Sequence, residues 1–157
     1  MIIDSASYSD NTNMPVKYAR VLVSGGKNIS PQFHWMDIPD GTKSFVLAMI
    51  DHYPIASNWV HWIVINIPAN CNMIQEGVSN TSKMPWKSIE LINTFGTKGY
   101  GGPQPPVGSG RHYYDTTIYA LNIDKLQLTG RVSESELLTN IRQHILDKAV
   151  LRGLFGR

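Results

Sequence analysis

The chain has 157 residues, 42% of them hydrophobic and 17% charged, and its formal net charge is +2. These values predict one ordered domain over residues 1–157 with a proper hydrophobic core, and the lack of a basic cluster argues against nucleic acid as a partner. The single cysteine, Cys71, excludes an internal disulfide framework, and residues 1–14 lack the pattern of a signal peptide, so we expect a cytoplasmic protein.

The first half of the chain is predicted to contain an extended arm followed by four strands. Residues 1–14 are rich in Ser, Asn and Asp and form the arm, and β-branched residues predict a strand over Val16–Val23. A short strand is expected at Phe33–Trp35. Ser44–Ile50 and Trp59–Ile67 are apolar on both faces, which is typical of strands that are covered on both faces. These two strands are therefore expected at the centre of a sandwich or layered fold.

The second half of the chain combines strands with one late helix. Aromatic and β-branched residues predict a strand over His112–Leu121. Ser133 and Glu136 match a capping box, in which each residue satisfies the backbone N–H group of the other. The helix that begins there is predicted to run to about Lys148, and Val150–Phe155 is predicted to be a last strand. The fold class is therefore mostly β with a C-terminal helix.

A loop rich in glycine and proline precedes the His112–Leu121 strand. Gly99–Asp115 reads GYGGPQPPVGSGRHYYD, and successive backbone N–H groups in such a loop can form a concave anion site without a metal. His112 and Tyr114 lie on the same face of the following strand, because side chains two residues apart in a strand point together. The pattern predicts an anion-binding pocket. The alternative is a stiff loop whose histidine and tyrosine only satisfy buried backbone groups.

Two further polar residues occur where a purely structural protein would not place them. Asp51 ends one apolar strand and His61 lies inside the other, between Val60 and Trp62. Burial of such groups is costly unless they are paired. If the two strands are neighbours, both residues lie at the same end of the sheet. His61 alone is better explained as a satisfied core histidine, whereas the set with His112 and Tyr114 favours a functional site.

Several of these segments resemble the phosphatidylethanolamine-binding protein family, in its bacterial and archaeal Raf-kinase-inhibitor-like branch. The similar segments are Asn28–Pro31 with Trp35, Gly41–Phe45, the stretch from Asp51 to Trp62, Gly99–Tyr114 and the closing HILDKAVLRGLFGR. The GYGGPxPP motif followed by GxGxHxY is the most specific of them. The resemblance covers nearly the whole chain.

This resemblance implies an antiparallel Greek-key β-sandwich with a C-terminal helix near a pocket for anions such as phosphate, phosphoryl-ethanolamine or acetate. The site residues that it implies are Asp51, Trp59, His61, Gly102, Gln104, Pro105, Pro106, His112 and Tyr114. Gly102 and Gln104 are expected to supply backbone donors. The chain departs from the family pattern at Tyr53, where a second aspartate is usual, at Gln104 and at Tyr113, and these departures bear on head-group specificity.

We therefore expect a binding or regulatory protein with no cofactor and no catalytic residue. His61 and His112 would donate hydrogen bonds to the anion while Asp51 orients an imidazole, so affinity should fall as the pH rises through the imidazole range near 6.5. By resemblance, the partner is a small anion or a phospholipid head group, a kinase or protease is a possible target, and a homodimer is suggested. Membrane contact is expected to be at most peripheral.

Two alternatives use the same residues. A hydrolase could employ a His–Asp pair among Asp51, His61 and His112 to activate water or Ser109, although GSG lacks the G-x-S-x-G context of a nucleophile elbow. A metal site could be built from two histidines and one carboxylate, although an anion site nearby favours negative charge.

Overall fold

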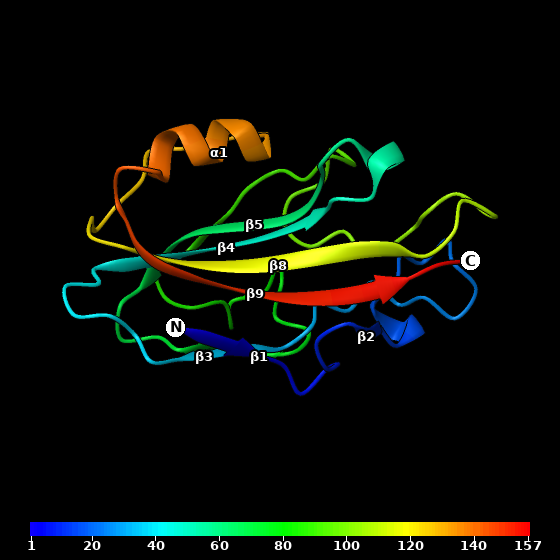
Figure 1. The fold of residues 1–157 in the computed structure, drawn as a ribbon, viewed down its shortest axis with the longest axis horizontal. Coiled ribbons are helices and arrows are strands. Elements are labelled where there is room, and N and C mark those ends of the chain that lie inside the picture. Colours follow the sequence, from blue (N-terminus) through cyan, green and yellow to red (C-terminus); the bar gives the residue numbers. More distant parts are fainter.

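The computed structural model describes residues 1–157, which form two β-sheets, one α-helix and two short 3-10 helices (Figure 1). The large sheet has six strands in the order β2 (Thr12–Asn13), β9 (Ile145–Phe155), β8 (His112–Leu121), β4 (Ser44–Asp51), β5 (Trp59–Pro68) and β7 (Ile89–Glu90). The small sheet has the order β1 (Ile2–Asp4), β3 (Phe33–Met36) and β6 (Met73–Ile74). The α-helix is α1 (Glu134–Ile141), and the 3-10 helices are η1 (Val16–Tyr18) and η2 (Pro54–Ala56). None of the helices is long and apolar enough to cross a membrane.

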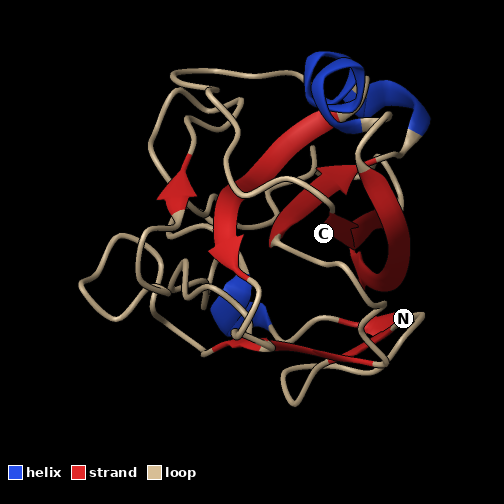
Figure 2. Ribbon diagram, turned by 90° about the vertical axis from the view of Figure 1, so that its left-hand side faces the viewer, coloured by secondary structure: helices blue, strands red, loops and turns tan.

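The large sheet is the middle layer of the molecule. Helix α1 covers one of its faces and the small sheet covers the other, an order that is visible in Figure 1 and again after a quarter turn in Figure 2. Successive residues of β4 serve the two sides: Leu47 belongs to the core cluster that includes Phe33, whereas Val46 belongs to the cluster that includes Leu137 of α1. All eight residues of β4 are buried. This confirms the expected position of the two-sided apolar strands at the centre of a layered fold.

The strand predictions are confirmed for β3, β4, β5 and β8, but the strand predicted over Val16–Val23 is absent. Those residues form η1 and then a series of turns, in which the Val23 N–H donates to Arg20 O at 2.9 Å and the Gly26 N–H donates to Val23 O at 2.8 Å. The turns leave Leu22 72% exposed. The prediction was wrong because β-branched composition alone ignores the local hydrogen bonds that the following glycines allow.

Helix α1 begins as predicted and ends early. The Glu136 N–H donates to Ser133 Oγ at 3.2 Å, which confirms one half of the capping box, whereas the Glu136 side chain makes no return bond to the Ser133 N–H. The helix stops at Ile141 instead of continuing to about Lys148. Residues Ile145–Phe155 form β9, which pairs with β8 along its whole length. The last strand therefore starts five residues before the predicted Val150, because the antiparallel pairing with β8 outweighs the local preference for more helix.

The large sheet is also not purely antiparallel. Strand β2 pairs parallel with β9, Thr12 opposite Gly153 and Asn13 opposite Leu154. The remaining pairs in both sheets are antiparallel. This short parallel contact attaches the N-terminal arm to the edge of the sheet. The Greek-key arrangement stays a prediction.

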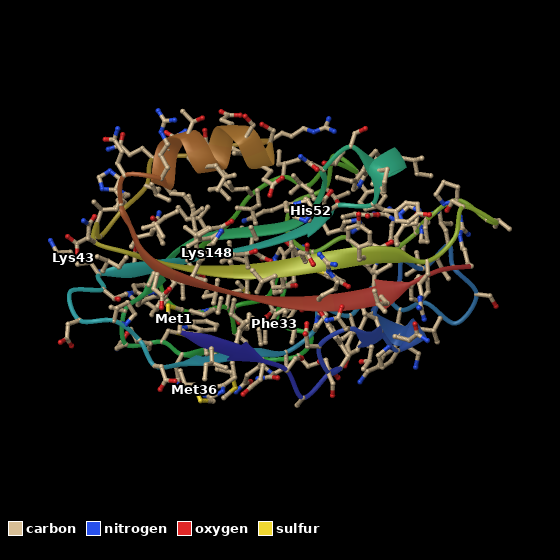
Figure 3. The ribbon with its side chains drawn as sticks, in the orientation of Figure 1. Met1, Phe33, Met36, Lys43, His52 and Lys148 are labelled. Atoms are coloured by element: carbon tan, nitrogen blue, oxygen red, sulfur yellow. The ribbon has the colours of Figure 1, made fainter.

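A half-buried ionic network connects the layers at the start of α1, where Figure 3 shows His52. His52 Nδ1 lies 2.8 Å from Asp115 Oδ2 and its Nε2 lies 3.0 Å from Glu134 Oε1, while Arg152 donates to both oxygens of Asp115. Burial lowers the pKa of His52, but the hydrogen bonds to Asp115 and Glu134 outweigh it and raise that pKa overall. The network joins the residue after β4 to β8, β9 and the helix.

The two-sided burial of β4 generates a prediction about stability. Leu47→Ala is expected to lower the free energy of unfolding by about 2–5 kcal/mol, because it removes a fully buried side chain and leaves a cavity. Urea denaturation measures the loss. The matched control is Leu22→Ala, which removes the same atoms from an exposed turn and should change stability by less than about 0.5 kcal/mol. Equal losses would contradict the described layering.

Candidate functional site

A pocket of about 210 Å³ opens at one end of the large sheet. Asp51 is the last residue of β4, and it pairs with Trp59 at the start of β5 on one side and with Tyr114 near the start of β8 on the other. This register brings residues from three strands to one point. In Figure 1 this is the end at which the C-terminus lies. The pocket is lined by Asp51, Ile55, Ala56, Trp59, His61, Phe95, Gln104, Pro105, Pro106, His112 and Tyr114.

All of the site residues expected from the sequence line this pocket except Gly102. The Gly102 N–H was expected to donate to an anion. It donates instead to Asn28 Oδ1 at 2.7 Å, so it is not available to a ligand. A Cβ atom at this position would lie 2.0 Å from the carbonyl oxygen of Tyr18. Gly102 therefore allows the loop to pack closely against the Tyr18 backbone, and the expected donor role is corrected. By contrast, the Gln104 N–H makes no hydrogen bond within the chain.

Asp51 and His112 form a buried pair. Asp51 is 4% exposed and His112 is 2% exposed, and His112 Nδ1 lies 2.7 Å from Asp51 Oδ2. The other oxygen of Asp51 accepts a hydrogen bond from the Tyr53 N–H at 2.9 Å. His112 Nε2 lies 3.0 Å from Ser109 Oγ, which is itself 2.7 Å from Pro106 O. Asp51 thus orients the imidazole of His112, whose second nitrogen is already engaged by Ser109.

His61 is held in a different way. Its ring is 2% exposed, and Nδ1 lies 2.5 Å from the carbonyl oxygen of Gly101. The Gly101 N–H donates in turn to the His61 carbonyl oxygen at 2.9 Å. Burial lowers the pKa of His61 to about 4, although the Gly101 carbonyl acts in the opposite direction. At neutral pH the ring is therefore uncharged, donates from Nδ1 and keeps a lone pair on Nε2.

Two buried donors at the pocket have no partner. Neither the hydroxyl of Tyr114 nor the indole N–H of Trp59 makes a hydrogen bond, and both atoms are inaccessible to solvent. Burial is the largest cause that raises the pKa of Tyr114, and the charge of Asp51 and a weak side-chain interaction with its carboxylate raise it further, so the hydroxyl keeps the proton. Buried polar groups are nearly always paired, and exceptions require an explanation. A bound acceptor would supply the missing partner.

Two arginines lie behind the pocket walls. The guanidinium of Arg20 is 4.0 Å from the centre of the Phe95 ring, and its positive charge contributes to the lowered pKa of His61. Arg157 donates from Nε to the carbonyl oxygen of Pro105, and its positive charge lowers the pKa of Tyr114, against the larger effect of burial. Both cations favour negative charge in the pocket without contacting the space directly.

Sequence reasoning missed Phe95 and did not assign Tyr53 to the site. Phe95 contacts Trp59 and His61 edge to face, with ring centres 5.2 and 5.5 Å apart. Tyr53 stacks on His112 with ring centres 4.2 Å apart. Phe95 stands alone in a turn-rich segment, so periodicity provides no signal for it. Tyr53 could have been found from its position two residues after Asp51.

The metal alternative lacks a set of ligands. No group of three or more histidine, cysteine, aspartate or glutamate side chains is arranged to hold an ion. Asp51 and His112 are hydrogen-bonded to each other, and Nδ1 of His61 is hydrogen-bonded to the carbonyl oxygen of Gly101, so these atoms are already engaged. The arrangement is instead suited to holding a small group that accepts several hydrogen bonds.

Comparison with known proteins shows which family the chain and its fold resemble. The family described as Phosphatidylethanolamine-binding protein matches residues 4–156. The UPF0098 protein of Aquifex aeolicus is 36% identical over 100% of this chain and 89% of its own length, and the UPF0098 protein YbhB of Escherichia coli is 36% identical over 83% of this chain and 84% of its own. The crystal structure of E. coli YbcL, described as a new member of the mammalian PEBP family, superimposes with a TM-score of 0.91 at 26% identity, covering 99% of this chain and 98% of that one.

The buried neutral state of His61 predicts how stability depends on pH. Between pH 6.5 and about 4 the unfolded chain binds a proton at His61 that the folded chain does not, so stability falls as the pH is lowered through this range. The contribution of His61 to this loss is about 3 kcal/mol at most. Urea denaturation from pH 7 to pH 4 measures it. His61→Gln should remove this part of the pH dependence, whereas His144→Gln, at a less buried site, should leave it in place. An unchanged slope in His61→Gln would contradict the assignment.

Proposed function

The chain belongs to the phosphatidylethanolamine-binding protein family, and we propose that its pocket binds a small phosphate-like anion, either free or carried by a phospholipid head group or a phosphorylated protein. The observation that carries this proposal is the pair of buried, unpartnered donors on Trp59 and Tyr114 at the wall of the pocket. Both atoms are covered in the structure, so an anion with several oxygen atoms would accept from them only after a small shift of the pocket wall. The free backbone N–H of Gln104 adds a third donor at the same wall.

The size of the pocket supports a head group rather than a whole lipid. Its volume of about 210 Å³ is below the range of about 300–1,000 Å³ that is usual for sites of drug-sized ligands. An acyl chain does not fit with a head group in such a space. The positive charges of Arg20 and Arg157 behind the walls add long-range attraction for an anion.

Exposed apolar side chains at the mouth of the pocket support the part of the proposal in which the anion is attached to a larger molecule. Ile55 lines the pocket and is 62% exposed, and Val107, which follows the lining residue Pro106, is 77% exposed. Exposed apolar side chains beside a pocket are suited to contact with a macromolecular partner. We include modulation of a kinase or protease, as in the Raf-kinase-inhibitor-like branch, in this part of the proposal.

One observation favours a hydrolase as a second candidate. Ser109, His112 and Asp51 are connected by the distances of 3.0 and 2.7 Å, in the order that a Ser-His-Asp triad requires. Ser109 has one hydroxyl proton, which can go either to His112 or to the carbonyl oxygen of Pro106. A proton shared with His112 would prepare Ser109 as a nucleophile. The contact with Pro106 opposes this, because a hydroxyl that donates there accepts from His112.

The anion proposal predicts that Tyr114→Phe weakens the binding of phosphoryl-ethanolamine about tenfold, because one hydrogen bond to a charged group is lost. Titration followed by NMR measures the affinity, with saturable shifts expected at His61, Gln104 and Tyr114 in the wild type. The matched control is Tyr113→Phe, since the ring of Tyr113 lies against Arg152 and does not line the pocket. Absence of saturable shifts with phosphate, phosphoryl-ethanolamine and acetate alike would refute the proposed function.

The second candidate predicts turnover of p-nitrophenyl acetate above the rate in buffer. Ser109→Ala should abolish it, because the nucleophile is removed, while Ser135→Ala on the exposed face of α1 should not change it. Release of p-nitrophenolate, followed by absorbance, measures the rate. Wild-type protein that does not exceed the buffer rate, or activity that survives in Ser109→Ala, would exclude this use of the Ser109–His112–Asp51 chain.

A further inference from the structure

The groups that await a partner in the pocket are not all donors. Nδ1 of His61 faces the carbonyl oxygen of Gly101, which can only accept, so Nδ1 carries the proton and Nε2 carries a lone pair. Nε2 makes no hydrogen bond within the chain, and it is not completely covered by neighbouring atoms. It is therefore open to the pocket that His61 lines. The pocket presents one acceptor beside its donors.

The orientation of the His61 ring is determined by its neighbours. Phe95 and Tyr114 contact it edge to face, with ring centres 5.5 and 5.0 Å away. Rotating the ring by half a turn would place a carbon atom against the Gly101 carbonyl and lose the hydrogen bond. The hydrogen bond to Gly101 therefore favours the orientation in which Nε2 carries the lone pair.

We propose that the pocket selects oxyanions that carry a proton, hydrogen phosphate and phosphate monoesters, over sulfate and phosphate diesters, because Nε2 of His61 accepts a hydrogen bond from the O–H group of the ligand. This inference rests on the proposed function and specifies its ligand class. A monoester oxyanion supplies one donor for His61 and an acceptor for the N–H of Gln104, and further acceptors for Trp59 and Tyr114 once the wall that covers their donors shifts. Sulfate and diesters supply only acceptors, so an oxygen lone pair would face the lone pair of Nε2 without a proton between them.

A fully deprotonated oxyanion could bind only if His61 first took a proton from water. Burial lowers the pKa of His61 to about 4, the carbonyls of Gly101 and Gly102 and the charge of Asp51 raise it, and Arg20 lowers it further. Two other titratable groups lie at the pocket wall. His112 is hydrogen-bonded to Asp51, and Tyr114 stays protonated because its pKa is raised. Protonating His61 at pH 7 costs about a thousandfold in affinity, because each pKa unit corresponds to a factor of ten.

A phosphate monoester brings the same proton at a lower cost. Its second pKa is about 6, so about one molecule in ten still carries the O–H group at pH 7. The expected preference for a monoester over sulfate is therefore about a hundredfold at pH 7 and about tenfold at pH 5. An intact phosphatidylethanolamine is a diester and lacks the O–H group, whereas free phosphoryl-ethanolamine and phosphorylated side chains have it.

The test is a titration of the wild-type protein at pH 5 and pH 7 with phosphoryl-ethanolamine, sulfate and glycerophosphoryl-ethanolamine, which is the matched diester. We expect the first to bind most tightly, with the preferences given above, and the ¹⁵N shifts of His61 to show a proton on Nδ1 in the free protein. A serine-phosphorylated peptide in the same series distinguishes a protein side chain from a small molecule as the source of the monoester.

The outcomes separate the inference from the proposed function. If all three small ligands bind with equal affinity, the inference is overturned and the anion pocket stands. If none binds, both are overturned. His61→Gln, whose amide can donate as well as accept, should reduce the preference for the monoester to less than about tenfold at pH 7. His144→Gln serves as the control and should retain it, and a preference that His61→Gln retains would also overturn the inference.

Discussion

The pairing of β4 with both of its neighbours is the constraint on which the pocket depends. Because Asp51 lies between Trp59 on β5 and Tyr114 on β8, the last residue of one strand and the first residues of two others share one end of the sheet. Both faces of β4 are buried, so a one-residue slip in register would exchange the side chains that fill the two cores and disturb the packing of both. The hydrophobic layers therefore hold the polar site in position.

The glycine-rich loop closes the pocket by close packing. Asn28 lies in the left-handed region at φ 52° and accepts from the Gly102 N–H, while its own side-chain N–H donates to Tyr100 O at 3.3 Å. This explains in physical terms why the Asn28–Pro31 segment and the glycine loop occur together in the resemblance: one provides the support for the other. Several donors of the loop are instead satisfied by the chain, as at Gly101 and Gly102, and Gln104 is one of the loop residues whose N–H stays free.

The electrostatics of the site follow from the different partners of its two histidines, each of which is only 2% exposed. His112 has a carboxylate partner, so a proton on its Nδ1 is stabilised by Asp51. His61 has only carbonyl partners in an apolar surrounding, which leaves it uncharged at neutral pH. The sequence-based expectation gave both rings the same donor role and a common pH dependence near 6.5. In the structure, the ring of His112 is engaged on both nitrogens, whereas the ring of His61 is uncharged at neutral pH and engaged only at Nδ1.

The sequence by itself determined the strands β3, β4, β5 and β8, the start of α1 and the set Asp51, His61, His112 and Tyr114, because these follow from apolar runs, a capping pattern and polar residues placed within them. Tertiary structure decided the rest. Pairing with β8 ended the helix at Ile141, local turns replaced the strand at Val16–Val23, and packing against Tyr18 removed Gly102 from the donors. The direction of each hydrogen bond at His61 also lies beyond sequence reasoning, since it depends on which atom of a residue 40 positions away faces the ring. Local patterns report which residues are buried; only the folded chain determines what each buried group meets.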